Sequence, residues 1–138
     1  MKRTISPEIK NKIINISAKE DNILTVYIFG SHGTDYQRKN SDLDLAILFE
    51  KGPDIMEQME LAGKYELKLG LEVDLINLNK SDIILKHEVI TKGEKIYSKD
   101  DLKTAEFVEY VLKFAPDARI TKKKFQDDYI RGLKEEIL

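Results

Sequence analysis

Hydrophobic residues follow two spacings along this chain, and the alternation between the two predicts a mixed α/β fold. Three runs rich in β-branched and aromatic residues end at glycine, proline or polar turn residues, as buried strands do. The predicted strands are residues 23–29, 41–49 and 71–78, with a further edge strand at 95–97. Between them, apolar residues recur every three or four positions and predict helices that cover the sheet.

The predicted helices start and stop at residues typical of helix ends. Ser6 before Pro7 is typical of an N-cap followed by proline at the first helical position, and Gly70 ends the second helix. The second and third helices are predicted over residues 54–69 and 81–91. The faces expected to be buried are Ile9, Ile13, Ile14 and Ala18 in the first helix, and Ile55, Met59, Ala62 and Leu69 in the second.

Two further apolar stripes near the C-terminus predict a helical hairpin. Pro116 separates them, because proline interrupts a helix. We therefore divide the single domain into a core, residues 1–98, and a helical extension, residues 99–138, which packs on the core or on a partner. The two stripes are Leu102, Ala105, Val108 and Leu112, then Phe125, Tyr129, Leu133 and Ile137.

Composition limits the classes of protein without choosing among enzymes. Charged residues make up 35% of the 138, yet 23 basic and 25 acidic side chains leave a net charge of only −2. This balance gives no electrostatic footprint for nucleic acid, so we do not expect direct nucleic-acid binding. With no cysteine, no signal-like apolar run and no apolar stretch of about 18–20 residues, we expect a cytoplasmic protein without a membrane segment.

A Gly-Ser pair followed, after ten residues, by two aspartates in a strand is the pattern that carries chemistry. Residues i and i+2 of a strand point to the same face, so Asp42 and Asp44 are expected to project together. Gly30 ends the preceding strand where backbone can approach a phosphate without a Cβ, and Ser31 adds a hydroxyl and turn N–H groups. The apolar alternate positions fill the opposite face of the second strand: Leu43, Leu45, Ile47 and Phe49.

A third aspartate, Asp74, interrupts the next apolar strand. Carboxylates in such runs carry a large desolvation cost unless a cation compensates their charge, and Mg²⁺ prefers carboxylate and phosphate oxygens. Asp42, Asp44 and Asp74 could together hold two Mg²⁺ ions about 3.5–4 Å apart, which would activate an attacking oxygen and stabilise a leaving pyrophosphate. Taken singly, each residue has a simpler interpretation: a turn at Gly30-Ser31, a strand cap at Asp42 or an ion pair at Asp74.

The segment FGSHGTDYQRKNSDLDLAIL resembles the Gly-Ser, ten residues, Asp-x-Asp signature of the polymerase-β-like nucleotidyltransferases. Most of the chain, through KHEVITKGEKIYSKDD and the terminal helices, resembles the minimal (MNT) branch, in particular the MntA-type antitoxins of HEPN–MNT toxin–antitoxin pairs. The resemblance implies the polymerase-β-like fold, with a small mixed sheet and flanking helices. It also implies the following roles: Asp42, Asp44 and Asp74 as metal ligands, Asp74 as base, and Gly30 with Ser31 as the phosphate-binding pair.

In the antitoxin branch, the resemblance implies AMP transfer from ATP, with two Mg²⁺ ions, onto a tyrosine of a partner HEPN ribonuclease toxin, which neutralises the toxin. Two other hypotheses stay open: a nucleotidyltransferase-shaped module that neutralises the toxin by complex formation, and a nucleotidyltransferase that acts on a small molecule or an RNA end. Many relatives carry arginine soon after Gly-Ser, whereas this chain has His32-Gly33-Thr34. The cation that holds the triphosphate therefore stays open, as do the preferred base and the acceptor.

Overall fold

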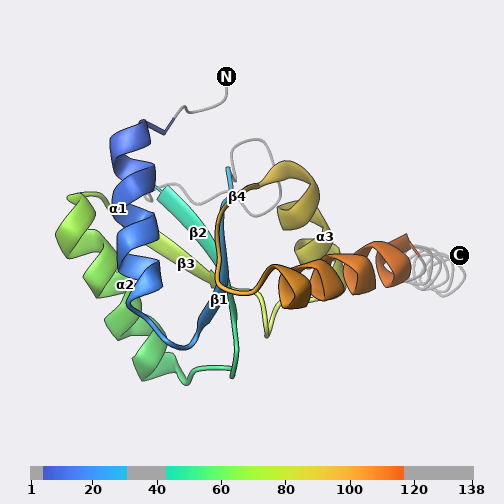
Figure 1. Cartoon of the computed structure of the whole chain (residues 1–138). Coiled ribbons are helices and arrows are strands. Elements are labelled where there is room, and N and C mark those ends of the chain that lie inside the picture. The colour runs from blue at the N-terminus through green and yellow to red at the C-terminus, as the bar shows by residue number, and fades with distance from the viewer. Residues whose placement is uncertain (1–4, 31–42, 117–138) are drawn as a thin grey trace, which may run out of the picture.

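The computed structural model of this chain describes residues 5–30 and 43–116 (Figure 1). Its strands are β1 (Ile23–Ile28), β2 (Leu43–Phe49), β3 (Val73–Asn77) and β4 (Glu94–Ser98). Its helices are α1 (Pro7–Ala18), α2 (Ile55–Leu69) and α3 (Ile83–Lys92), and residues 101–116 are also helical. The predicted mixed α/β fold is confirmed. The second half of the predicted hairpin lies outside the described residues.

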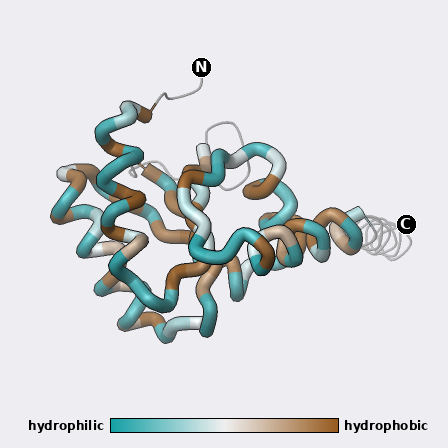
Figure 2. Tube along the Cα trace, viewed as in Figure 1, coloured by the Kyte–Doolittle hydropathy of each residue, from teal (hydrophilic) through white to brown (hydrophobic). Residues whose placement is uncertain are grey.

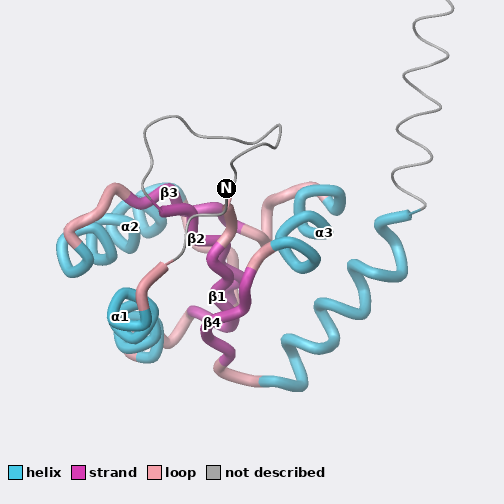
Figure 3. The backbone as a smooth tube through the Cα atoms, turned by 90° about the horizontal axis from the view of Figure 1, so that it is seen from above, coloured by secondary structure: helices cyan, strands magenta, loops and turns pink. Residues whose placement is uncertain are grey.

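The strands form one mixed sheet in the order β3-β2-β1-β4. β1 pairs antiparallel with both β2 and β4, whereas β2 and β3, joined through α2, run parallel. Within the described residues, α1 and α2 cover one face of this sheet, and α3 with the helix at 101–116 covers the other (Figures 1 and 3). No helix in these ranges is long and apolar enough to cross a membrane.

Capping residues fix the ends of the helices largely as the sequence predicts. The Ser6 hydroxyl accepts a hydrogen bond from the Ile9 N–H, and Pro7 occupies the first helical position. At α2, the Asp54 side chain and Glu57 form a reciprocal capping box. At its other end Gly70 adopts the left-handed conformation, with φ of 67°, which ends the helix because glycine reaches it at little cost.

The predicted buried faces of the helices need correction. In α1, Ile16 is buried and Ala18 is exposed, and in α2, Ile55 and Met59 are 66% and 64% exposed. The side chains that α2 buries are Leu61, Tyr65 and Leu69. In the helix at 101–116, Leu102 and Leu112 are exposed, whereas the buried side chains are Thr104, Val111 and Ala115.

Polar groups with internal partners occupy part of the buried faces that the apolar stripes did not predict. Ser17 donates to the Ile13 carbonyl oxygen at 2.7 Å, so its oxygen accepts the Tyr65 hydroxyl proton at 2.8 Å. Thr104 bonds to the hydroxyl of Thr25 at 2.7 Å and to that of Ser98 at 2.9 Å. Buried hydroxyls are stable when they are paired, and hydrophobic periodicity does not reveal such pairs.

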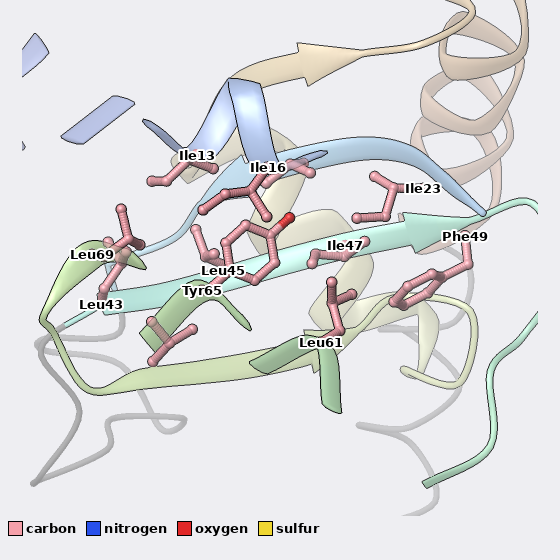
Figure 4. Close-up of a cluster of buried hydrophobic side chains, with 12 residues drawn as sticks. Ile13, Ile16, Ile23, Leu43, Leu45, Ile47, Phe49, Leu61, Tyr65 and Leu69 are labelled. Atoms are coloured by element: carbon pink, nitrogen blue, oxygen red, sulfur yellow. The ribbon is translucent and has the colours of Figure 1, made fainter. Parts of the chain in front are cut away.

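The larger core lies between the sheet and the α1–α2 layer. Tyr65 reaches from α2 toward β2 among isoleucines and leucines of both layers (Figure 4). The predicted apolar face of β2 is confirmed, since the residues Leu43, Leu45, Ile47 and Phe49 all belong to this core. The alternate residues of β2 therefore face α3, where a second core joins Phe29, Ala46, Leu48 and Val89. Hydrophobic positions accordingly concentrate on the central strands (Figure 2).

Replacing Tyr65 by phenylalanine tests the buried hydroxyl pair. We expect Tyr65→Phe to lower the free energy of unfolding by about 1 kcal/mol at neutral pH, because the Ser17 oxygen loses its partner. Burial raises the pKa of Tyr65 from 10.0 to about 12. The unfolded state therefore loses this proton first, so the contribution is complete below pH 10 and declines as the pH rises toward 12.

Urea denaturation from pH 7 to pH 11 measures both effects. The matched control is Tyr110→Phe, at a side chain that is 53% exposed. An equal loss of stability in the two variants, or an equally steep alkaline decline in Tyr65→Phe and the unsubstituted chain, would contradict this account.

Two glycine-to-alanine substitutions should change stability in opposite directions. A Cβ on Gly93 would lie 2.5 Å from the Val89 carbonyl oxygen and 3.1 Å from that of Ile28, so Gly93→Ala should destabilise by about 1–3 kcal/mol. A Cβ on Gly63, within α2, meets nothing within 4 Å, so Gly63→Ala should stabilise by about 1 kcal/mol through helix propensity. Thermal unfolding of both variants measures the difference, and a stable Gly93→Ala protein would refute the close approach.

Candidate active site

Two of the predicted site aspartates are paired across neighbouring strands. In the parallel register of β2 and β3, Asp44 lies directly beside Asp74. Neighbouring strands are about 4.8 Å apart and residues in register share a face, so both carboxylates project from the sheet side that faces α3. Asp44 is 7% exposed, and Asp74 is half-buried. The structure therefore brings these two acids together in a setting that is largely withdrawn from water.

Backbone hydrogen bonds bring the end of β1 and the starts of β2 and β3 together beside the two aspartates. The Phe29 N–H, at the end of β1, donates to the Asp44 carbonyl oxygen at 3.0 Å. The Leu43 N–H donates to the Glu72 carbonyl oxygen at 3.1 Å, which joins the start of β2 to the start of β3. Gly30 follows directly after Phe29, so the predicted phosphate-binding end of β1 and the two aspartates lie at the same end of the sheet.

Gly30 has no role in packing within the described part of the chain. A Cβ built on it meets no atom within 4 Å, and its φ is not positive. A bound phosphate close to the backbone thus stays the predicted reason for glycine here. The other members of the predicted site, Ser31 and Asp42, lie outside the described residues, and their positions relative to Gly30 and Asp44 stay predictions.

The chemistry of the paired carboxylates fits a divalent cation. Like charges directly opposite one another in a sheet are destabilising, and a hard cation such as Mg²⁺ relieves this while it binds carboxylate oxygens. Across residues 5–30 and 43–116, no group of three or more acidic or histidine side chains could hold a metal ion. Asp42, the third predicted ligand, is outside these ranges, and the ligand roles of Asp44 and Asp74 stay predictions.

A second polar region lies at the end of the sheet opposite to Asp44 and Asp74. It is a hollow beside the start of β1 and the ends of β2 and β4, and two of its lysines contact other residues that line it. Lys103 pairs with Glu50 at 3.1 Å, and Lys99 donates to the Asp21 carbonyl oxygen at 2.7 Å. We place the candidate site at the Asp44–Asp74 end, because the predicted site residues of the described chain lie there.

Sequence reasoning missed one residue beside the site. The Glu66 carboxylate, on α2, accepts a hydrogen bond from the Val73 N–H at 3.1 Å, directly before Asp74. Hydrophobic periodicity gave no signal for this contact, because it depends on β3 being the edge strand.

Neighbouring aspartates on two parallel strands, beside a glycine at the end of the antiparallel strand, are the arrangement expected of a nucleotidyltransferase. The chain belongs to the polymerase beta nucleotidyltransferase family, whose model matches residues 11–102. That range begins within α1 and reaches the start of the last described helix, so it covers the whole sheet and Asp44 with Asp74. The predicted family is confirmed.

Several known proteins resemble this chain. Protein adenylyltransferase MntA of Shewanella oneidensis is 35% identical over 91 residues, which are 64% of this chain and 64% of that protein. The match thus covers less than two thirds of that relative's length. A tri-AMPylated Shewanella oneidensis HEPN toxin in complex with MNT antitoxin gives a TM-score of 0.72 at 24% identity, covering 89% of this chain and 97% of that chain. A toxin–antitoxin crystal structure with AMP-PNP gives 0.70 at 26% identity, covering 88% and 98%.

Proposed function

We propose that this protein is an adenylyltransferase that moves AMP from ATP onto a tyrosine of a partner HEPN ribonuclease toxin and so neutralises it. The observation that carries the proposal is the in-register pairing of Asp44 with Asp74 at the sheet end where Gly30 lies. The family match and the protein adenylyltransferase name of the Shewanella relative support it. We also propose that the protein acts in the cytoplasm, where ATP is available as substrate.

The resemblance to the family implies a role for each residue of the motif. Asp42, Asp44 and Asp74 would hold two Mg²⁺ ions, and Gly30 with Ser31 would bind the phosphates through backbone N–H groups and a hydroxyl. Bound Mg²⁺ would neutralise phosphate charge and favour ionisation of the attacking hydroxyl. Asp44 is buried, so water would screen its attraction to a bound cation less than at the protein surface.

In the proposed reaction, the nucleophile is the hydroxyl group of the acceptor tyrosine. Its oxygen forms a bond to the α-phosphorus of ATP while the bond from that phosphorus to the bridging oxygen breaks, and pyrophosphate leaves. The hydroxyl proton passes to the Asp74 carboxylate, which acts as general base, and then to solvent. The chain therefore has to orient the triphosphate, keep a carboxylate close to the acceptor and limit competition from water.

A second candidate function is neutralisation by binding alone. The helix at 101–116 exposes Leu112 and an aromatic pair, Tyr110 and Phe114, whose ring centroids are 4.9 Å apart. Exposed aromatic side chains on one helix favour a protein contact. In this hypothesis residues 99–138 would be the docking extension. We prefer the enzymatic function because the family match and the in-register pair of Asp44 and Asp74 both fit a nucleotide site.

The decisive experiment follows label from α-labelled ATP, with Mg²⁺, onto the product of the neighbouring reading frame. We expect transfer by the unsubstituted chain and a loss of at least about a hundredfold in Asp44→Asn, since one metal-binding charge is removed. Asp21→Asn, the same chemical change at the opposite end of the sheet, should transfer AMP at the normal rate.

A stable complex with the neighbouring protein but no labelling would support the binding hypothesis instead. Labelling of an aminoglycoside or a tRNA, with no protein acceptor present, would support the small-molecule or RNA-end hypothesis. Full transfer by a folded Asp44→Asn protein would contradict the proposed mechanism.

A further inference from the structure

A side chain from α2 accepts a hydrogen bond from the outer edge of β3. Among the described residues, β3 pairs with β2 alone, so it is an edge strand of the sheet. Alternate N–H groups of an edge strand point away from the sheet and lack a neighbouring strand. At Val73 this outward N–H donates to the Glu66 carboxylate, with 3.1 Å between the nitrogen and Oε2.

Glu66 also takes part in the turn that leads into β3. Its backbone carbonyl oxygen accepts the Gly70 N–H at 2.9 Å, which closes the last turn of α2. Its side chain then accepts from Val73, three residues beyond Gly70. One residue therefore holds both ends of the connection from helix to strand, and β3 starts at a fixed position relative to α2.

The position of this connection matters for Asp74, the residue that follows Val73. The Leu43 N–H donates to the Glu72 carbonyl oxygen at 3.1 Å on the inner side of β3, and Glu66 holds the outer side. Without the outer bond, the first residues of β3 would be held from one side only, and edge strands fray from their ends. A metal site needs its ligands within about 0.5 Å of their working positions, so fraying at Val73 would affect binding.

We propose that Glu66 is a positioning residue, which holds the start of β3 so that Asp74 stays beside Asp44. This inference rests on the proposed function, because it concerns the same metal and nucleotide site. In this role Glu66 acts through its hydrogen bond with the backbone of Val73. Its role depends on a hydrogen-bond acceptor at this place, and its negative charge is dispensable.

Three variants separate this role from a general loss of stability. Glu66→Ala removes the acceptor, and Glu66→Gln keeps an amide oxygen that accepts the same bond without the charge. Asp54→Ala is the matched control, because it removes the capping box at the other end of the same helix, away from Asp74. Urea denaturation of all three establishes how much each change destabilises the protein.

The main measurement is the dissociation constant for Mn²⁺ with a non-hydrolysable ATP analogue, by titration calorimetry on the full chain. We expect Glu66→Ala to weaken Mn²⁺ binding about three- to tenfold, and Glu66→Gln and Asp54→Ala to stay within twofold of the unsubstituted protein. Amide exchange should become faster at Val73 and Asp74 in Glu66→Ala and stay unchanged there in Asp54→Ala. In the AMP-transfer assay, Glu66→Ala should need more Mg²⁺ for half-maximal rate.

Three results would overturn the proposal. Unchanged Mn²⁺ affinity in Glu66→Ala would exclude a positioning role while the proposed function stands. Equal weakening in Glu66→Ala and Glu66→Gln would assign the effect to charge, and equal weakening in Asp54→Ala would assign it to stability. Failure of the unsubstituted chain to bind Mn²⁺ with the nucleotide would contradict the proposed function itself, which distinguishes that failure from the other three patterns.

Discussion

The register between β2 and β3 is the constraint on which the candidate site depends. Because side chains alternate across a strand, a slip of one residue would move Asp74 to the face that α1 and α2 cover. Hydrogen bonds at both ends of the pair oppose such a slip, from Leu43 to the Glu72 carbonyl oxygen and from Leu78 to that of Ile47, at 3.1 and 2.9 Å. The apolar face of β2 adds a further penalty, since a slip there would expose core residues.

One face of the sheet carries the larger hydrophobic core, and the other face carries the two aspartates of the candidate site. On the α1–α2 side, a closed core forms around Tyr65, whose hydroxyl is paired with Ser17. On the other side, Ala46 and Ile76 are followed toward the strand starts by Asp44 and Asp74, and Phe29 of the second core lies beside Asp44. The charged pair therefore lies on a pair of strands that is packed on both faces, with the larger core on the opposite face.

The strands could be predicted well from the sequence, and the helix faces could not. Alternation in β2 has a single solution, since Leu43, Leu45, Ile47 and Phe49 fit only one face, and this places Asp44 on the other. Helices allow neighbouring stripes of similar hydrophobicity, so Met59 was assigned to a buried face that Tyr65 in fact occupies. Tyr65 and Thr104 are buried with hydrogen-bond partners that are distant in sequence, and hydrophobic spacing does not reveal such partners.

The site was predictable to the extent that spacing and strand register define it. Asp44 and Asp74 each interrupt an apolar strand, and their pairing follows once β2 and β3 are parallel neighbours. Glu66 was not predictable, because its partner, the Val73 N–H, needs a side-chain acceptor only at the open edge of the sheet. The family resemblance supplied the expected roles of Ser31 and Asp42, which lie outside the described residues.

The central claim is that Asp44 and Asp74 bind the same divalent metal site. Its most direct test is a crystal structure of the full chain with Mn²⁺ and a non-hydrolysable ATP analogue, with anomalous scattering recorded to locate the metal. We predict an anomalous peak within coordinating distance of both carboxylates, with the nucleotide phosphates on its other side. A bound nucleotide whose Mn²⁺ ions contact neither Asp44 nor Asp74 would contradict the account.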